Sequence, residues 1–167
     1  MSEGKRVKAS NRVIVSNLVP RYRIQSRKVG RIAQMALKTL GCRRAFLSLV
    51  FVTPSMIKRL NQRFLNHSWA TDVIAFPFSA PFMAKAALKG NRFLGEVLIS
   101  PDAAKKNAKR FGTRFEEELS RYVCHGILHL KGYSDKTNRL KMRMRRKEDK
   151  ILKVFSAELK GIIQDGH

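Results

Sequence analysis

The spacing of apolar residues changes along the chain, and each change marks a predicted strand or helix. Short runs of apolar, β-branched and aromatic residues predict strands over 13–16, 45–52, 71–78 and 93–100. Apolar residues three or four positions apart predict helices over 29–40 and 54–64, between Pro101 and Gly112, between Thr113 and Gly132, and from Thr137 or Asn138 to Leu159. The segment 79–92 is the longest irregular stretch and a candidate substrate-side loop.

The order of these elements, β-α-β-α-β-β-α-α-α, predicts an α+β fold. We expect a single domain over residues 1–167 with its core within 10–160, built on a small mixed sheet of about four strands with helices packed on it. The helix ends carry capping signals: Thr53 before Pro54, Thr113 with Glu116 as a capping box, and Gly132 as a stop.

The charge of the chain narrows the class of partner. Lys and Arg number 35 against 12 Asp and Glu, which gives a net charge of +23 over 167 residues. A polyanion must offset such an excess, and nucleic acid is the usual one. No segment approaches the ~20 apolar residues that span a bilayer, and the N-terminus lacks the apolar stretch of a secretory signal. We therefore expect a cytoplasmic protein with a nucleic-acid partner, no membrane contact and no dinucleotide cofactor.

The stretch HGILHLKGYSD, residues 125–135, carries the candidate chemistry. On a helix, His125 and His129 lie one turn apart on the same face, so both imidazoles can reach one cation. Gly132 ends the helix, and the chain can then reverse to bring Asp135 back as a third ligand. Two histidines at this spacing can also simply line a helix, but the glycine and the carboxylate favour a metal site. Three ligands and an open position predict a catalytic site for one Zn²⁺ or another divalent transition metal.

The residue after the first histidine restricts the reaction. Zinc proteases with two histidines at this spacing use a glutamate there as general base, and this chain has Gly126. Peptide hydrolysis would lack its proton acceptor. A phosphodiester needs less from the protein, because a metal can polarise a phosphoryl oxygen and supply the nucleophilic water, while basic residues offset the phosphate charge. The RNA 2′-hydroxyl is an alternative nucleophile.

Three segments resemble the YbeY endoribonucleases, a family of bacterial ribosomal-RNA maturation factors. HGILHLKGYSD is similar to the family signature HGxLHLxGYDH. LNQRFLNHSWATDVIAFPF, residues 60–78, resembles LNxxYRxxxxPTDVLSFP, and LGEVLIS resembles the strand GDIxIS. The resemblance covers most of residues 10–160. It implies an α+β, metal-dependent, single-strand-specific endoribonuclease that acts on ribosomal RNA, has the small ribosomal subunit as partner, and serves ribosome quality control.

The chain departs from the family pattern at two positions. Asp135 stands where the family has a third histidine, and aspartate is also a zinc ligand. Leu65 stands where the family has an arginine that is taken to act on the substrate phosphate. Arg63, two residues away, is a candidate substitute if the helix end reorients. The candidate catalytic residues are thus His125 and, as the substitute for the family arginine, Arg63. The candidate metal ligands are His125, His129 and Asp135.

Basic residues concentrate in three segments, 5–31, 105–114 and 139–150, which together are typical of a phosphate-tracking surface. The candidate nucleic-acid-binding residues are Tyr22 for base stacking and Arg63, Lys105, Lys109, Arg143 and Arg146 for phosphates. Two alternatives to the endoribonuclease remain. The first is a ribosome-associated RNA-binding or assembly factor with a degenerate or structural metal site, which Leu65 favours. The second is a metalloprotease, which Gly126 and the charge disfavour.

Overall fold

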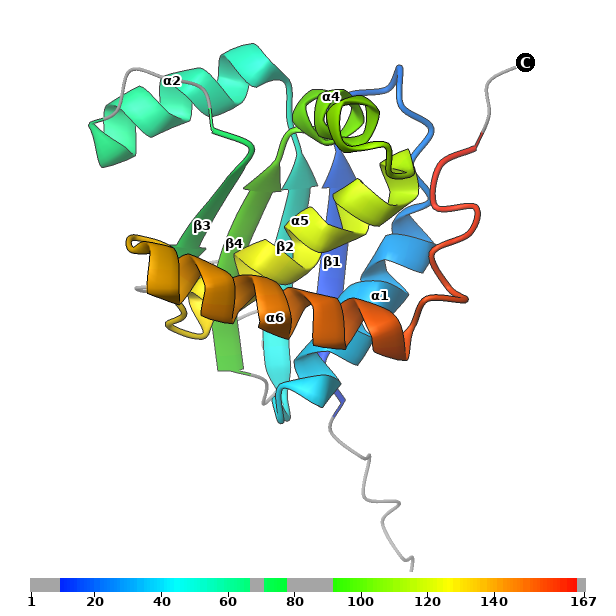
Figure 1. Ribbon diagram of the computed structural model, residues 1–167, viewed down its shortest axis with the longest axis vertical. Coiled ribbons are helices and arrows are strands. Elements are labelled where there is room, and N and C mark those ends of the chain that lie inside the picture. Colours follow the sequence, from blue (N-terminus) through cyan, green and yellow to red (C-terminus); the bar gives the residue numbers. More distant parts are fainter. Residues whose placement is uncertain (1–9, 67–70, 78–91, 165–167) are drawn as a thin grey trace, which may run out of the picture.

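Four strands form one mixed sheet, and helices pack against it (Figure 1). The computed structural model describes residues 10–66, 71–77 and 92–164. Its elements in chain order are β1 (Arg12–Asn17), α1 (Ser26–Thr39), β2 (Ala45–Phe51), α2 (Pro54–Leu65), β3 (Val73–Pro77), β4 (Arg92–Ile99), α4 (Pro101–Phe111), α5 (Phe115–Leu130) and α6 (Asn138–Val154). The predicted order and the α+β fold are confirmed. The candidate loop 79–92 lies outside the described residues except for Arg92, the first residue of β4.

The sheet has the strand order β1-β2-β4-β3. β2 pairs in parallel with both β1 and β4, while β3 joins the far edge of β4 in the antiparallel direction. The predicted central strand is therefore confirmed, because β2 has a hydrogen-bonded neighbour on each side. Its side chains Leu47, Leu49 and Phe51 are fully buried on one face, as the alternation of a strand requires.

Helix α5 is the central element of the helical layer on that face. Figure 1 shows it crossing the strands, with α1, α4 and α6 around it. Ten of its 16 residues are buried, and the apolar ones share one core with β2, α1 and α6. On the opposite face, a smaller cluster joins Ile57 of α2 to Ile74 of β3 and Leu98 of β4. A helix enclosed on so many sides holds its side chains in fixed positions, and α5 carries both histidines of the candidate site.

Most helix boundaries follow the predicted capping signals. Thr53, Ser100 and Thr137 each accept a hydrogen bond from a backbone N–H three residues later. The predicted capping box of Thr113 and Glu116 is wrong. Helix α5 begins one residue later, with Arg114 at the N-cap, and the Thr113 hydroxyl instead donates to Glu118 Oε1 at 2.9 Å.

The C-terminal helix is shorter than predicted. Its apolar positions Met144, Ile151, Phe155 and Leu159 are all buried, but α6 ends at Val154. Phe155 and Leu159 continue the buried seam in a turn-rich segment that follows the helix. Burial of that seam does not require helix geometry, which explains why the apolar spacing overestimated the helix length. In the described part of the chain, no helix is long and apolar enough to cross a membrane.

Gly126 sets how closely α5 approaches the sheet. A Cβ built at Gly126 would overlap Cγ1 of Val97 and lie 3.0 Å from its Cγ2. Val97 belongs to β4 and is fully buried. The glycine that replaces the protease glutamate is therefore also a packing requirement, because any side chain there would push α5 away from β4.

We expect Gly126→Ala to lower the free energy of unfolding by about 1–3 kcal/mol, the usual cost of overpacking a core. Val97→Ala removes the two overlapping methyl groups, so the double variant should be less destabilised than the sum of the single variants. Urea unfolding followed by circular dichroism measures this coupling. A Gly126→Ala protein as stable as the original chain would mean that α5 can shift without cost.

Candidate metal centre

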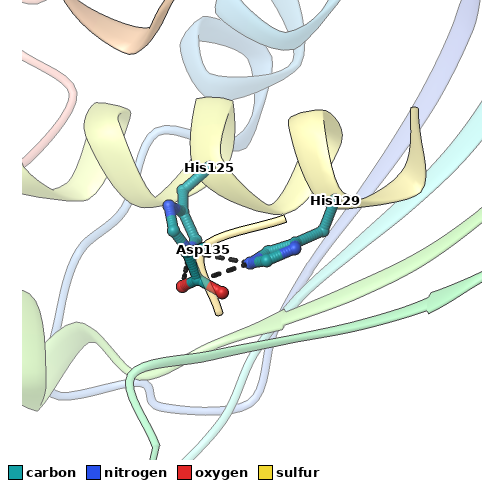
Figure 2. A group of neighbouring side chains, drawn as sticks. All are labelled: His125, His129 and Asp135. Carbon is teal, nitrogen blue, oxygen red and sulfur yellow. Dashed lines mark hydrogen bonds and ion pairs between the residues drawn. The ribbon is translucent and has the colours of Figure 1, made fainter. Parts of the chain in front are cut away.

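The end of α5 and the turn after it bring three ligand-type side chains together (Figure 2). His125 and His129 occupy successive turns of the helix. Lys131 is the C-cap, and Gly132 follows with φ +89°, a left-handed conformation that favours glycine. The chain then reverses, and Asp135 faces both imidazoles as predicted from the sequence.

The three ligand atoms lie close enough to share one ion. His125 Nε2 and His129 Nε2 are 2.9 Å apart, and Asp135 Oδ2 is 3.6 Å and 3.8 Å from them. All lie within 4.8 Å of one another, and the described residues contain no other group of this kind. Two nitrogens bound to one Zn²⁺ at ~2.0–2.1 Å are roughly 3.3 Å apart in a tetrahedral site, so the donor spacing suits a small divalent cation.

The second nitrogen of each histidine is held by the protein. His125 Nδ1 is 2.7 Å from Glu148 Oε1, and His129 Nδ1 is 3.1 Å from the carbonyl oxygen of Tyr133. Both partners are acceptors, so both Nδ1 atoms donate, and each imidazole in its neutral form then presents the lone pair of Nε2 to the other ring. Burial and the neighbouring His125 lower the pKa of His129, which favours its neutral form. Two facing lone pairs repel unless a cation lies between them, so the donor set fits a metal ion.

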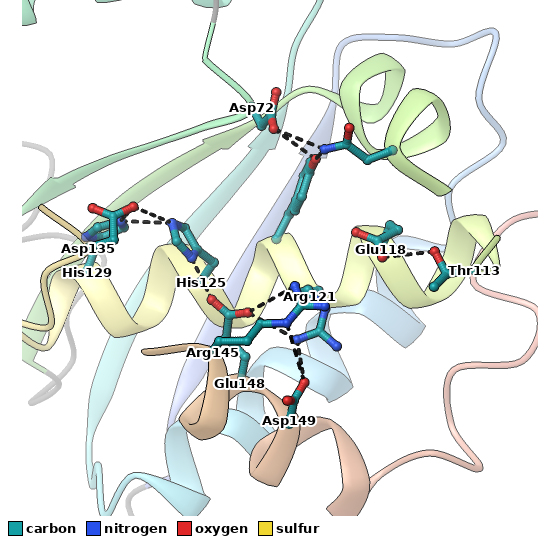
Figure 3. A network of polar contacts seen from close by, with 12 residues as sticks. Asp72, Thr113, Glu118, Arg121, His125, His129, Asp135, Arg145, Glu148 and Asp149 are labelled. Carbon is teal, nitrogen blue, oxygen red and sulfur yellow. Dashed lines mark hydrogen bonds and ion pairs between the residues drawn. The ribbon is translucent and has the colours of Figure 1, made fainter. Parts of the chain in front are cut away.

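Glu148 belongs to a buried ionic network between α5 and α6 (Figure 3). It is 4% exposed, and its other oxygen, Oε2, accepts a hydrogen bond from Arg121 NH1 at 3.1 Å. The same Arg121 nitrogen donates to Asp149 Oδ1 at 2.7 Å. Glu148 was not among the residues expected from the sequence. The available signal was its place on the buried side of α6, four residues after Met144 and three before Ile151.

A cleft of about 630 Å³ opens beside the metal-ligand group. Its walls come from the start of β3, from α4, α5 and α6, and from the turn that carries Asp135. At the β3 wall, Asp72 Oδ2 accepts hydrogen bonds from Tyr122 OH at 3.0 Å and Asn107 Nδ2 at 3.3 Å. Asp72 thus connects the start of β3 to α4 and α5.

The predicted arginine does not join this group. The guanidinium of Arg63 lies 5.7 Å from the centre of the Phe64 ring, and neither Arg63 nor Leu65 is among the described residues that line the cleft. Leu65, at the end of α2, is 45% exposed. The catalytic role of Arg63 therefore stays a prediction that the geometry does not support.

The other nucleic-acid-binding candidates are spread over the surface. Tyr22 is partly buried, with its hydroxyl donating to Asp102 at 2.8 Å and Lys105 5.7 Å from its ring centre. Lys109 is exposed on α4. Arg143 and Arg146 line a second hollow on α6, which does not include the metal-ligand group. Their roles in RNA binding remain predictions.

Comparisons with known proteins agree with the motif. The model of the family "Endoribonuclease YbeY" matches residues 17–156. A relative with that name from Chlorobaculum parvum is 38% identical over 119 residues, 71% of this chain and 78% of its own. One from Aquifex aeolicus is 33% identical over 160 residues, 95% of this chain and all of its own.

A solved structure shares the fold. The solution structure of TM1509 from Thermotoga maritima superposes with a TM-score of 0.53 at 23% identity and covers 87% of this chain and 92% of that one. At this identity the likeness concerns the fold alone. The family model and the curated relatives identify the chain itself: it belongs to the endoribonuclease YbeY family.

Proposed function

We propose that this protein is a metal-dependent endoribonuclease that cleaves single-stranded RNA. The observation that carries the proposal is the pair of facing His Nε2 atoms with Asp135 beside them at the edge of an open cleft. The net charge of +23 supplies the attraction for a polyanionic substrate. The family relationship supports the same activity, since the relatives are named endoribonucleases.

His125, His129 and Asp135 would hold the metal through Nε2, Nε2 and a carboxylate oxygen. Zn²⁺ suits this set because it accepts mixed nitrogen and oxygen ligands in tetrahedral geometry, and three protein ligands leave one position open. A divalent metal in such a site acts as a Lewis acid on a phosphoryl oxygen and lowers the pKa of water. Glu148 fixes the His125 ring so that Nε2 points at the site.

The surroundings of the site favour a phosphodiester over a peptide. Gly126 leaves no carboxylate on α5 directly after His125, and its contact with Val97 leaves no room for one. Besides Asp135, the described residues that line the cleft include the carboxylates of Asp72, Glu118 and Glu148. Each is engaged in hydrogen bonds: Asp72 with Tyr122 and Asn107, Glu118 with Thr113, and Glu148 with His125 and Arg121. Ribosomal RNA, as part of the small ribosomal subunit in the cytoplasm, is the substrate that we infer for maturation and quality control.

A second candidate is a ribosome-associated assembly factor that binds RNA without cutting it. The position of Arg63 and Leu65 outside the cleft favours this candidate, because the family pattern has an arginine where this chain has Leu65. A cleavage experiment separates the two.

We expect the metal-loaded protein to cut single-stranded RNA and to leave an unstructured peptide intact. Chelation should abolish cleavage, and added Zn²⁺ should restore it. Gel analysis of a labelled RNA before and after chelation provides the measurement, with His125→Ala as the control for contaminating ribonuclease. If the metal-loaded chain binds RNA but never cuts it, the assembly-factor candidate is correct.

Asp135→Ala should weaken metal binding at least ~10–100-fold, because even loss of an outer-shell partner has that effect. Asp135→His should retain the metal, since imidazole is an equivalent ligand. Zinc competition with a chromophoric chelator gives both affinities. Equal zinc affinity for Asp135→Ala and the original chain would remove Asp135 from the ligand set.

Glu148→Gln should lower metal affinity ~10–100-fold by weakening the hydrogen bond that orients His125. Asp149→Asn is the matched control, because Asp149 shares Arg121 with Glu148 but does not touch His125. Zinc titration of both variants, together with thermal unfolding of their metal-free forms, separates ring orientation from loss of the ionic network. An equal loss of affinity in the two variants would contradict the orienting role.

A further inference from the structure

Cleavage of a phosphodiester builds up negative charge on the phosphate, and cations placed beforehand around it stabilise that charge. Among the described residues, three cationic side chains line the cleft beside the metal centre: Arg121, Lys141 and Arg145. Arg63 is absent from its described lining, and Leu65 carries no charge. The cation that binds the phosphate must therefore lie on an element other than α2. This inference rests on the proposed ribonuclease activity.

Arg121 has a structural role between α5 and α6. Its side chain is buried, and one nitrogen donates to both Glu148 and Asp149. Moving it toward a substrate would leave Glu148 buried without its cation, which is costly. Arg121 therefore organises the wall of the cleft and does not take the phosphate.

Arg145 is held much more loosely. Its side chain is 57% exposed, and its closest ion-pair distances are 3.8 Å to Asp149 and 4.0 Å to Glu148. These distances exceed hydrogen-bond length. The reason is visible in Figure 3: the oxygens of Glu148 are already occupied by His125 and Arg121, and Arg121 also takes the near oxygen of Asp149. The donors of Arg145 thus have no close acceptor among these carboxylates.

Lys141 lies one turn before Arg145 on the same side of α6. It is exposed, and within the described residues it forms no ion pair. Helix stability does not explain a cation there, because the N-terminal end of a helix favours negative charge and the first turn of α6 contains no acidic residue. The two side chains start about 6 Å apart along the helix axis, which allows them to contact one phosphate or two successive phosphates.

We propose that Lys141 and Arg145 form the phosphate-binding wall of the cleft and hold the RNA backbone against the metal centre. The polar contacts of Glu148 between α5 and α6 support this placement. Glu148 touches His125 directly, and Arg145 lies one turn before Glu148 on α6. Arg143 and Arg146 line a different hollow together with Arg139, so they extend the basic surface beyond the site of cleavage.

The test uses the metal-loaded full chain and a matched pair of double variants. Lys141→Gln with Arg145→Gln lowers the charge of the cleft by two. Lys58→Gln with Arg59→Gln lowers the charge of the protein by the same amount on exposed positions of α2 that do not line the cleft. Single-turnover cleavage of a labelled single-stranded RNA and the affinity for Zn²⁺ are measured for both.

The cleft variant should cleave ~100-fold or more slowly, the scale on which loss of one preorganised donor slows a reaction. Its Zn²⁺ affinity should be unchanged, and the α2 variant should cleave within about twofold of the original chain. Arg145→Lys should recover part of the rate lost by Arg145→Gln, because lysine keeps the charge but not the planar fork of donors. Equal cleavage rates for the two double variants would overturn the proposal.

Failure of the underlying ribonuclease activity gives a different result. If the original chain binds Zn²⁺ but does not cut RNA, the affinity of the variants for a trinucleotide RNA shows whether Lys141 and Arg145 bind phosphate. The cleft variant should then bind more weakly than the α2 variant, with a salt dependence shallower by about 0.7 for each phosphate that it no longer neutralises. Equal trinucleotide affinity and equal salt dependence in the two variants would show that Lys141 and Arg145 do not bind phosphate.

Discussion

The hydrogen bond between His125 Nδ1 and Glu148 Oε1, 2.7 Å long, connects α5 and α6, the two helices on which the site depends. It fixes which nitrogen of His125 faces the metal position. It also ties α6 to α5, because Glu148 is held from its other oxygen by Arg121. A carboxylate buried to this degree is stable only while its partners are in place, so the orientation of the ligand and the docking of the last helix depend on the same contact.

The two helices differ in burial, and their roles in the candidate site differ accordingly. Helix α5 is enclosed by the sheet and by three other helices, and it supplies the histidines at fixed positions. Helix α6 packs against α5, and its exposed residues are strongly basic. The enclosed helix therefore carries the candidate metal ligands, where small displacements matter most, and the partly exposed one carries the charges that we propose for binding RNA.

Local signals in the sequence predicted the fold and the three candidate metal ligands, but not the residues around them. Apolar spacing and caps are properties of neighbouring residues, and they placed the four strands, the helices and the turn at Gly132 that returns Asp135. Glu148 could not be found in that way, because its partners His125 and Arg121 are more than 20 residues away along the chain.

The basic residues of α6 were also recognised from the sequence, but which of them face the cleft depends on how α6 is rotated about its axis. That rotation is set by the packing of Met144, Ile151 and Leu152. The sequence therefore singled out Arg143 and Arg146, whereas Lys141 and Arg145 line the cleft.

The contact between Gly126 and Val97 has a consequence for the evolution of this scaffold. Two histidines one turn apart occur in proteases and in this family alike, and a single codon change from glycine can produce glutamate. That change would create the protease motif in one step, but the new side chain would have to occupy space already filled by β4. Unless a smaller residue replaced Val97 or the strand moved, that change would destabilise the fold. The van der Waals contact behind the candidate metal ligands thus makes the step between the two chemistries costly in stability, whatever its effect on catalysis.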